Sequence, residues 1–238
     1  MNSIKEKNIS IFIKLIAIIA SIYGMIATYS GYEHLTYFTN LSNVFIDIML
    51  GIFLVLTLKG KKPKNNFYRI KYLATISITL TFFVYMFVIG PNNPEGLIGS
   101  YLRDGGGNFC VHFITPVLSL IDYLLYDYEF ESSKIDNLYG VIPPVLYVVS
   151  VFVASFLGMR WPDDMYAPYN FLNYHSKVGW FGFDLSQMSS TTFGIGVFYM
   201  IILLTVIFVI FGNILLKLKD FRKKHIKHQL HNKKIRGR

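Results

Sequence analysis

Long apolar stretches alternate with short polar connections along most of the chain. Each stretch is close to the roughly 20 residues that an α-helix needs to cross about 30 Å of hydrocarbon. The first stretch is too long for the apolar part of a signal peptide, and no cleavage site of small residues follows it. The pattern predicts an all-α integral membrane protein, a bundle of six transmembrane helices at residues 9–30, 38–58, 70–90, 108–127, 138–157 and 192–216.

Two of the connections differ in character from the rest. Residues 91–107 are rich in Gly, Pro and Asn, which indicates a loop. Residues 158–191 form a connection long enough to suggest a function of its own. Its aromatic residues suit the interface between lipid headgroups and water: Trp161, Tyr166, Tyr169, Tyr174 and Trp180.

Composition supports the membrane interpretation. Of the 238 residues, 53% are apolar and only 16% are charged, whereas soluble domains have about 25% charged residues. The apolar residues are gathered in blocks, which favours one helical bundle over two domains. We therefore expect a transmembrane domain at 1–216 and a basic tail at 217–238.

The net charge of +9 is distributed unevenly between the two sides of such a bundle. Twenty of the 23 Lys and Arg lie in the N-terminal region, the second and fourth connections and the tail. The other three are Arg103, Arg160 and Lys177. The positive-inside rule predicts both termini in the cytoplasm and a multi-pass protein of the cell membrane. The tail is expected to contact anionic lipid, not nucleic acid.

Metal and disulfide chemistry are not indicated. A single cysteine, Cys110, excludes an intramolecular disulfide and a cysteine-based zinc site. His225, His228 and His231 recur in the tail, but the surrounding lysines repel a cation. No metal and no cofactor are therefore expected.

One face of the fourth predicted helix carries polar residues. His112, Thr115, Ser119 and Asp122 are spaced by three, four and three residues, which places them on one stripe. Pro116 lies four residues after His112, so the His112 carbonyl loses its usual amide donor. Ionisable groups inside a membrane are costly, and by default they face the bundle interior and are functional.

The second predicted helix opens with "YFTNLSN" and has a matching face. Thr39, Asn43 and Asp47 are spaced by four residues. Thr39 and His112 both lie at the outer ends of their helices. At 1.5 Å per residue, the two stripes are expected to meet at two levels, with Thr39 beside His112 outside and Asp47 near Asp122 inside.

A hydroxyl beside an imidazole is the minimum for nucleophilic acyl chemistry. His112 would take the proton and the Thr39 oxygen would attack a carbonyl, with Asn40 or Asn43 donating to the oxyanion. The structural alternatives are ordinary. Thr39 or Asn40 would cap helix two, and Asn43 would join helices. Asp47 and Asp122 would pair with Lys14 or Lys71, or would remain protonated.

Three motifs together resemble the bacterial Pr6Pr membrane proteins. They are "FTNLSN" from Phe38, "HFITPVLSLIDYLL" from His112 and "YAPYNFL" from Tyr166. That family is more distantly similar to the androgen-induced, FAR-17a-like membrane hydrolases of animals, in which a threonine and a histidine hydrolyse fatty acid esters of hydroxy fatty acids. The resemblance implies Thr39 and His112 as the catalytic pair. An alignment anchored on Asn43 leaves Ser42 as the alternative nucleophile.

The leading hypothesis is an intramembrane lipid-ester hydrolase that acts on a fatty acyl ester through Thr39 and His112. Ser42, Asn43 and Asp122 are supporting candidates, and Trp161 and Tyr169 are substrate-binding candidates. The alternatives are a transporter or proton-coupled protein that uses Asp47, His112 and Asp122, a non-catalytic membrane scaffold, and an acyltransferase that uses Cys110.

Overall fold

The computed structural model describes residues 4–236 and contains six helical segments long and apolar enough to cross a membrane, which confirms the number expected from the sequence. The spans are Ile4–Ala27, Phe38–Leu58, Asn65–Ile89, Gly96–Tyr126, Lys134–Phe156 and Val197–Ile226. Their helices and π-helical turns are α1 (Ile4–Ala27), α2 (Phe38–Leu58), α3 (Asn65–Val84) with the π turn Tyr85–Ile89, α4 (Gly96–Phe109), the π turn Cys110–Ile114, α5 (Thr115–Tyr126), α6 (Lys134–Tyr139), α7 (Ile142–Phe156) and α8 (Val197–Arg236).

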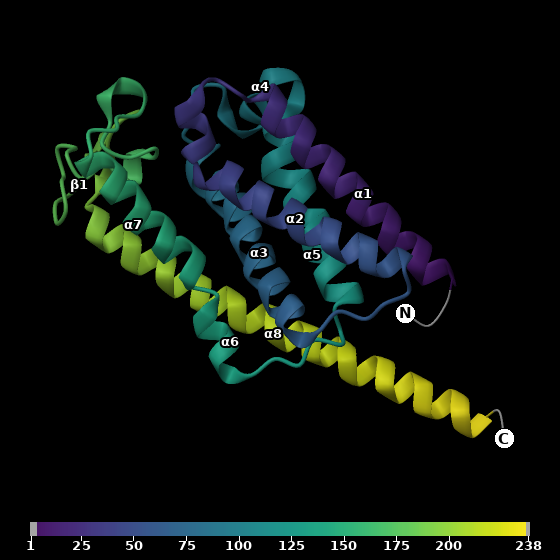
Figure 1. Ribbon diagram of the computed structural model, residues 1–238. Helices are drawn as coiled ribbons and strands as arrows, with labels where there is room; N and C mark the ends of the chain where they lie inside the picture. Colours follow the sequence, from purple (N-terminus) through teal and green to yellow (C-terminus); the bar gives the residue numbers. More distant parts are fainter. Residues whose placement is uncertain (1–3, 237–238) are drawn as a thin grey trace.

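The first four spans form a bundle, and α7 and α8 lie along one side of it (Figure 1). Within the bundle, α1 packs against α2 and α5, and α3 packs against the same two helices. Many apolar side chains on the outer faces are exposed, including Ile202, Leu203 and Ile210 of α8. An apolar exterior of this extent is the expected surface of a protein that contacts lipid tails.

The outer connections contain more regular structure than the sequence predicts. Residues 91–107 are not a continuous loop, because α4 begins at Gly96. The chain leaves helical geometry only from Arg103 to Gly106, where Asp104, Gly105 and Gly106 have positive φ. The long fifth connection contains the 3₁₀ turns Pro162–Asp164 and Asn170–Leu172, and then an antiparallel hairpin of β1 (Phe183–Met188) and β2 (Phe193–Ile195).

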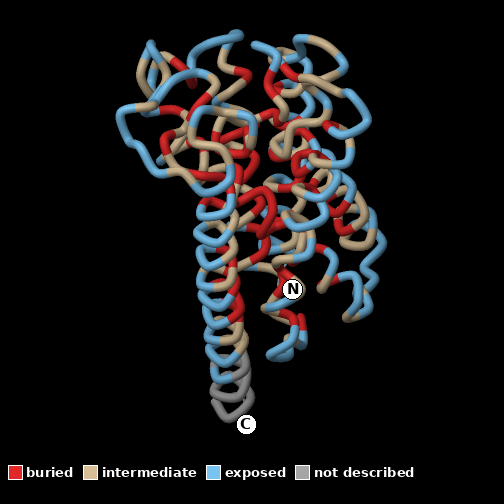
Figure 2. The backbone as a smooth tube through the Cα atoms, turned by 90° about the vertical axis from the view of Figure 1, so that its left-hand side faces the viewer, coloured by how far each residue is buried: buried red, intermediate tan, exposed pale blue. Residues whose placement is uncertain are grey.

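The ends of several predicted helices also need correction. The first begins at Ile4, the third at Asn65 and the fifth at Lys134, because polar first turns continue helices whose apolar part begins later. The sixth begins at Val197 instead of 192, since the preceding residues form β2. This helix also continues through the basic tail to Arg236 and extends beyond the other helices (Figure 1). The coloured part of α8 in Figure 2 is exposed on the side that faces away from the bundle.

A buried cluster of ionic groups joins three helices near one end of the bundle. Asp122 of α5 lies 2.6 Å from Lys14 Nζ of α1 and also pairs with Lys71 of α3. Lys71 pairs in addition with Asp127 at 2.6 Å. The four side chains are at most 3% exposed. The two positive charges of the lysines equal the two negative charges of the carboxylates. Buried charges are tolerated when they are paired in this way.

Asp122→Asn is expected to lower the free energy of unfolding by about 3–5 kcal/mol, because it leaves two buried lysines with one carboxylate. Equilibrium unfolding in mixed micelles measures this. The matched control is Glu129→Gln, which removes the pair of Glu129 with Lys62, a residue 77% exposed. The control is expected to cost about 0–1 kcal/mol. Equal effects of the two substitutions would show that the buried cluster is not a stabilising centre.

Candidate functional site

The polar residues at the start of α2 do not cap the helix. The N-cap position is Tyr37, and no side chain bonds to the first-turn amides in the usual capping manner. The expectation that Thr39 or Asn40 caps α2 is therefore wrong. Asn40 instead donates from Nδ2 to the His34 carbonyl at 2.7 Å. The first-turn amide of Thr39 donates to the hydroxyl of Tyr169, 130 residues further along the chain, at 3.4 Å.

Ser42 and Asn43 are engaged in helix packing. The Ser42 hydroxyl lies 2.9 Å from the Thr81 hydroxyl of α3 and 3.0 Å from the Thr39 carbonyl, to which it donates. Asn43 donates to the Thr39 carbonyl at 2.8 Å and to the Val111 carbonyl at 3.3 Å. These bonds hold the backbone of Thr39 in place, and they occupy the Asn43 amide that the sequence analysis assigned to an oxyanion.

Pro116 affects a different carbonyl from the one expected. A π turn spans Cys110–Ile114, and the Thr115 amide donates to the Cys110 carbonyl five residues earlier. In this register the carbonyl that faces the missing amide of Pro116 is that of Val111. The Asn43 amide supplies a donor to it. The expectation for the His112 carbonyl assumed an uninterrupted α-helix, which the π turn replaces.

His112 lies inside this π turn and is 7% exposed. Its ring stacks on Tyr85, with ring centroids 3.8 Å apart and planes at 19°. Tyr85 opens the second π turn, Tyr85–Ile89, at the end of α3. The Nδ1 atom of His112 is buried and forms no hydrogen bond with the described residues. Such a group is available to a ligand and is costly when left unpaired.

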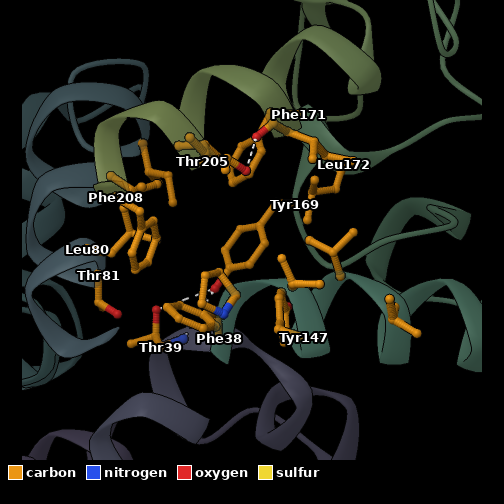
Figure 3. A pocket seen from close by; sticks show the side chains of 18 of the residues that line it. Phe38, Thr39, Leu80, Thr81, Tyr147, Tyr169, Phe171, Leu172, Thr205 and Phe208 are labelled. Atoms are coloured by element: carbon orange, nitrogen blue, oxygen red, sulfur yellow. Dashed lines mark hydrogen bonds between the residues drawn. The ribbon is translucent and has the colours of Figure 1, made fainter. Parts of the chain in front are cut away.

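Two cavities meet at Thr39 and His112. The first, here called the apolar cavity, has a volume of about 280 Å³ and lies between α2, α3, α7 and α8 (Figure 3). Its walls are mainly aliphatic and aromatic, with Leu80, Tyr147 and Phe208 among them. Val145 and Val149 line it and are about half exposed. The apolar cavity therefore opens toward the side of the bundle along α7.

The second cavity, here called the polar chamber, has a volume of about 540 Å³ and lies among the outer connections. Its walls carry amide and hydroxyl groups, including those of Asn108, Asn170 and Ser189. Four residues line both spaces and are here called the neck: Thr39, Ile89, His112 and Tyr169. Neither cavity is lined by Ser42 or Asn43, so Thr39 is the hydroxyl of "YFTNLSN" that reaches the neck.

Tyr169, a substrate-binding candidate in the sequence, lines both cavities at the neck. Its hydroxyl is 3.5 Å from the Thr39 hydroxyl, in addition to accepting from the Thr39 amide (Figure 3). Its ring packs edge-on against Tyr37 with centroids 5.3 Å apart. Burial raises the pKa of the Tyr169 phenol above its ordinary value. Tyr169 is therefore a neutral phenol at pH 7, able to donate as well as accept a hydrogen bond.

Asp47 and Asp122, which were expected to lie near each other at the inner ends of the two polar stripes, have different partners. Asp47 accepts from the Ser21 hydroxyl at 2.7 Å, whereas Asp122 pairs with Lys14 and Lys71. Both Ser21 and Lys14 belong to α1. The prediction that Asp47 lies near Asp122 is wrong because α1 supplies a separate partner to each carboxylate. The alternative in which lysines pair with Asp122 is confirmed, but it is wrong for Asp47, which bonds to the Ser21 hydroxyl.

Trp161 and Cys110 lie away from the neck. Trp161 is 3% exposed and donates from Nε1 to the Thr36 hydroxyl at 2.9 Å, so it is a packed loop residue and not part of an aromatic belt at the lipid surface. It lines neither cavity. Cys110 faces α1, where a Cβ added to Gly24 would lie 3.0 Å from the Cys110 Cβ.

Among the residues whose side chains the structure describes, 4–226 and 228, no three His, Cys, Asp or Glu converge on a possible metal site. The side chain of His231 in the tail lies outside the described residues. Comparison with known protein families, with characterised proteins and with solved structures finds no match. The candidate site therefore rests on the geometry of the neck.

Proposed function

We propose that the protein hydrolyses a lipid ester at the neck, with Thr39 as nucleophile and His112 as general base. One observation carries the proposal. A threonine hydroxyl and a buried histidine with an unpaired nitrogen lie where an apolar cavity meets a polar chamber. An ester lipid has the same division, with an acyl chain on one side of its carbonyl and a polar alcohol on the other.

The reaction requires the Thr39 hydroxyl to exchange its contact with Tyr169 for one with His112. His112 accepts the hydroxyl proton, and the Thr39 oxygen forms a bond to the ester carbonyl carbon. The alcohol leaves with the proton from His112, and the acyl group stays on Thr39. A water molecule, deprotonated by His112, then releases the fatty acid and restores the Thr39 hydroxyl.

Tyr169 is the best-placed donor to the oxyanion that develops on the carbonyl. Its neutral hydroxyl lies 3.5 Å from the Thr39 oxygen that attacks, and a donor fixed at the reacting centre stabilises developing charge. Asn43 contributes indirectly, because it holds the Thr39 carbonyl. Asp122 acts at a distance, through the ionic cluster that fixes α5.

The proposed orientation in the membrane places the neck near the outer leaflet. The six spans and the excess of Lys and Arg in the connections on the side of the termini support cytoplasmic termini and a location in the cell membrane. The neck then lies toward the outer leaflet, at the same end as the β1–β2 hairpin. The basic end of α8 would contact anionic lipid. The resemblance to the Pr6Pr proteins, and more distantly to the FAR-17a-like hydrolases, agrees with this chemistry.

Thr39→Ala and His112→Ala are each expected to lower hydrolysis of a laurate ester in nanodiscs by about 10²–10⁴-fold, since each removes one half of the proton transfer and attack. Thr39→Ser keeps the hydroxyl and is expected to retain activity. Release of laurate, followed by mass spectrometry, measures the rates.

The matched control is Thr205→Ala. Thr205 lines the same apolar cavity, but its hydroxyl donates to the Ile201 carbonyl at 2.7 Å. Its loss is expected to leave the rate within a few-fold of the parent. Hydrolysis that survives both Thr39→Ala and His112→Ala would exclude this pair as the catalytic centre.

Topology is tested by labelling single cysteines in intact cells after Cys110→Ala. Ser186→Cys in β1 is expected to react with a membrane-impermeant maleimide, whereas Lys61→Cys between α2 and α3 is expected to react only after permeabilisation. Both positions are exposed, so accessibility reports the side of the membrane. The reverse pattern would place the termini outside the cytoplasm.

A further inference from the structure

The polar chamber has an unusual composition for a site that faces the aqueous side of a membrane. None of the residues that line it is Lys, Arg, Asp or Glu. Its polar groups are neutral amides and hydroxyls. The amides come from several separate elements: Asn40, Asn92, Asn93, Asn108 and Asn170.

The nearest guanidinium is already neutralised. Arg103 donates to the Asn93 side chain at 3.2 Å, but it also forms an ion pair with Glu95 at 3.1 Å and does not line the chamber. His34, which does line the chamber, is kept neutral at pH 7 because burial lowers its pKa from the ordinary value of 6.5. A ligand in the polar chamber therefore meets no unpaired cation.

Several of the amides retain hydrogen-bonding capacity. Asn92 and Asn170 each donate from Nδ2 to a backbone carbonyl, at 2.6 and 2.9 Å, which orients their carbonyl oxygens. The Asn108 side chain forms no hydrogen bond with any residue in the described part of the chain. An alcohol hydroxyl both donates and accepts hydrogen bonds. The amide oxygens of the polar chamber can accept from it and the amide nitrogens can donate to it.

We infer that the polar chamber binds the uncharged, hydroxyl-bearing part of the lipid, a glycerol or a sugar, and that the apolar cavity holds its acyl chain. A phosphate or carboxylate in this chamber would lose water without gaining a cation, which is unfavourable. A polyol loses water and gains amide partners. The substrate class is therefore a neutral acyl polyol, such as an acylglycerol or an acylated sugar.

This inference rests on the proposed function only for the identity of the ester, so binding is tested with ethers and other analogues that the reaction does not cleave. The probe is a dodecyl glyceryl ether whose chain ends in a diazirine, cross-linked to the full-length protein in phosphatidylcholine nanodiscs. Glucoside and maltoside detergents are removed beforehand, because they carry the proposed headgroup. Unlabelled dodecyl glyceryl ether, dodecyl glucoside, dodecyl phosphate and laurate compete.

The glyceryl ether or the glucoside is expected to compete at least about tenfold more strongly than the phosphate and laurate, a difference equal to one or two hydrogen bonds. Whichever of the two competes better identifies glycerol or sugar as the source of the polyol. Equal or stronger competition by the anions, or no cross-linking of α7 or α8, would overturn the inference. Polyol preference without hydrolysis of any matched ester would retain the inference and reject the proposed catalysis.

A charge substitution provides the second arm. Asn92→Lys places a cation in the polar chamber at an exposed position and is expected to strengthen competition by dodecyl phosphate about tenfold. Asn66→Lys makes the same change at an exposed position near the start of α3, at the other end of the bundle, and is expected to leave competition unchanged. If competition by dodecyl phosphate strengthened equally in both variants, the effect would come from the net charge of the protein and not from binding in the polar chamber.

Discussion

The pairing of Asp122 with Lys14 and Lys71 is the constraint on which the arrangement of the bundle depends. A carboxylate buried among apolar helices requires partners, and these come from α1 on one side and α3 on the other. Because Asp122 is fixed, the rotation of α5 about its axis is fixed as well. The Thr115 hydroxyl, on the same stripe, then faces the Ala17 carbonyl of α1. His112 lies three residues before Thr115, less than one helical turn away, and stacks on Tyr85.

The neck lies where three helical segments become irregular or end and where the outer connection reaches them. α2 begins there with an uncapped first turn, α3 ends in a π turn, the segment before α5 forms another, and the outer connection delivers Tyr169. Irregular backbone inside a membrane protein is tolerated where it lines a cavity or is buried in protein, and π turns often occur at functional sites. The apolar cavity and the polar chamber meet at this level, so an ester bond bound there would have its chain and its alcohol in matching surroundings.

The sequence was sufficient to predict six helices and to place Thr39 and His112 at one level, because apolar length and residue depth are local properties. It did not predict which stripe faces which helix. Asp47 and Asp122 bond to residues of α1 that are seven positions apart, Ser21 and Lys14, an arrangement that depends on tertiary packing. Pro116 signalled a disturbed helix, but the sequence did not show the π register that moves the effect to the Val111 carbonyl, nor the Asn43 amide that donates to it. The contact of Tyr169 with Thr39 spans 130 residues, and only the position of Tyr169 in an aromatic-rich connection suggested a site there.

The proposed hydrolysis requires Thr39 to become acylated during turnover. Acid quenching of the protein with a laurate ester of glycerol, followed by protease digestion and peptide mass spectrometry, tests it directly. A lauroyl group is expected to appear on Thr39 during turnover and to be absent from the Thr39→Ala variant. Turnover accompanied by a lauroyl group on Ser42 or Cys110 instead would exclude Thr39 as the nucleophile.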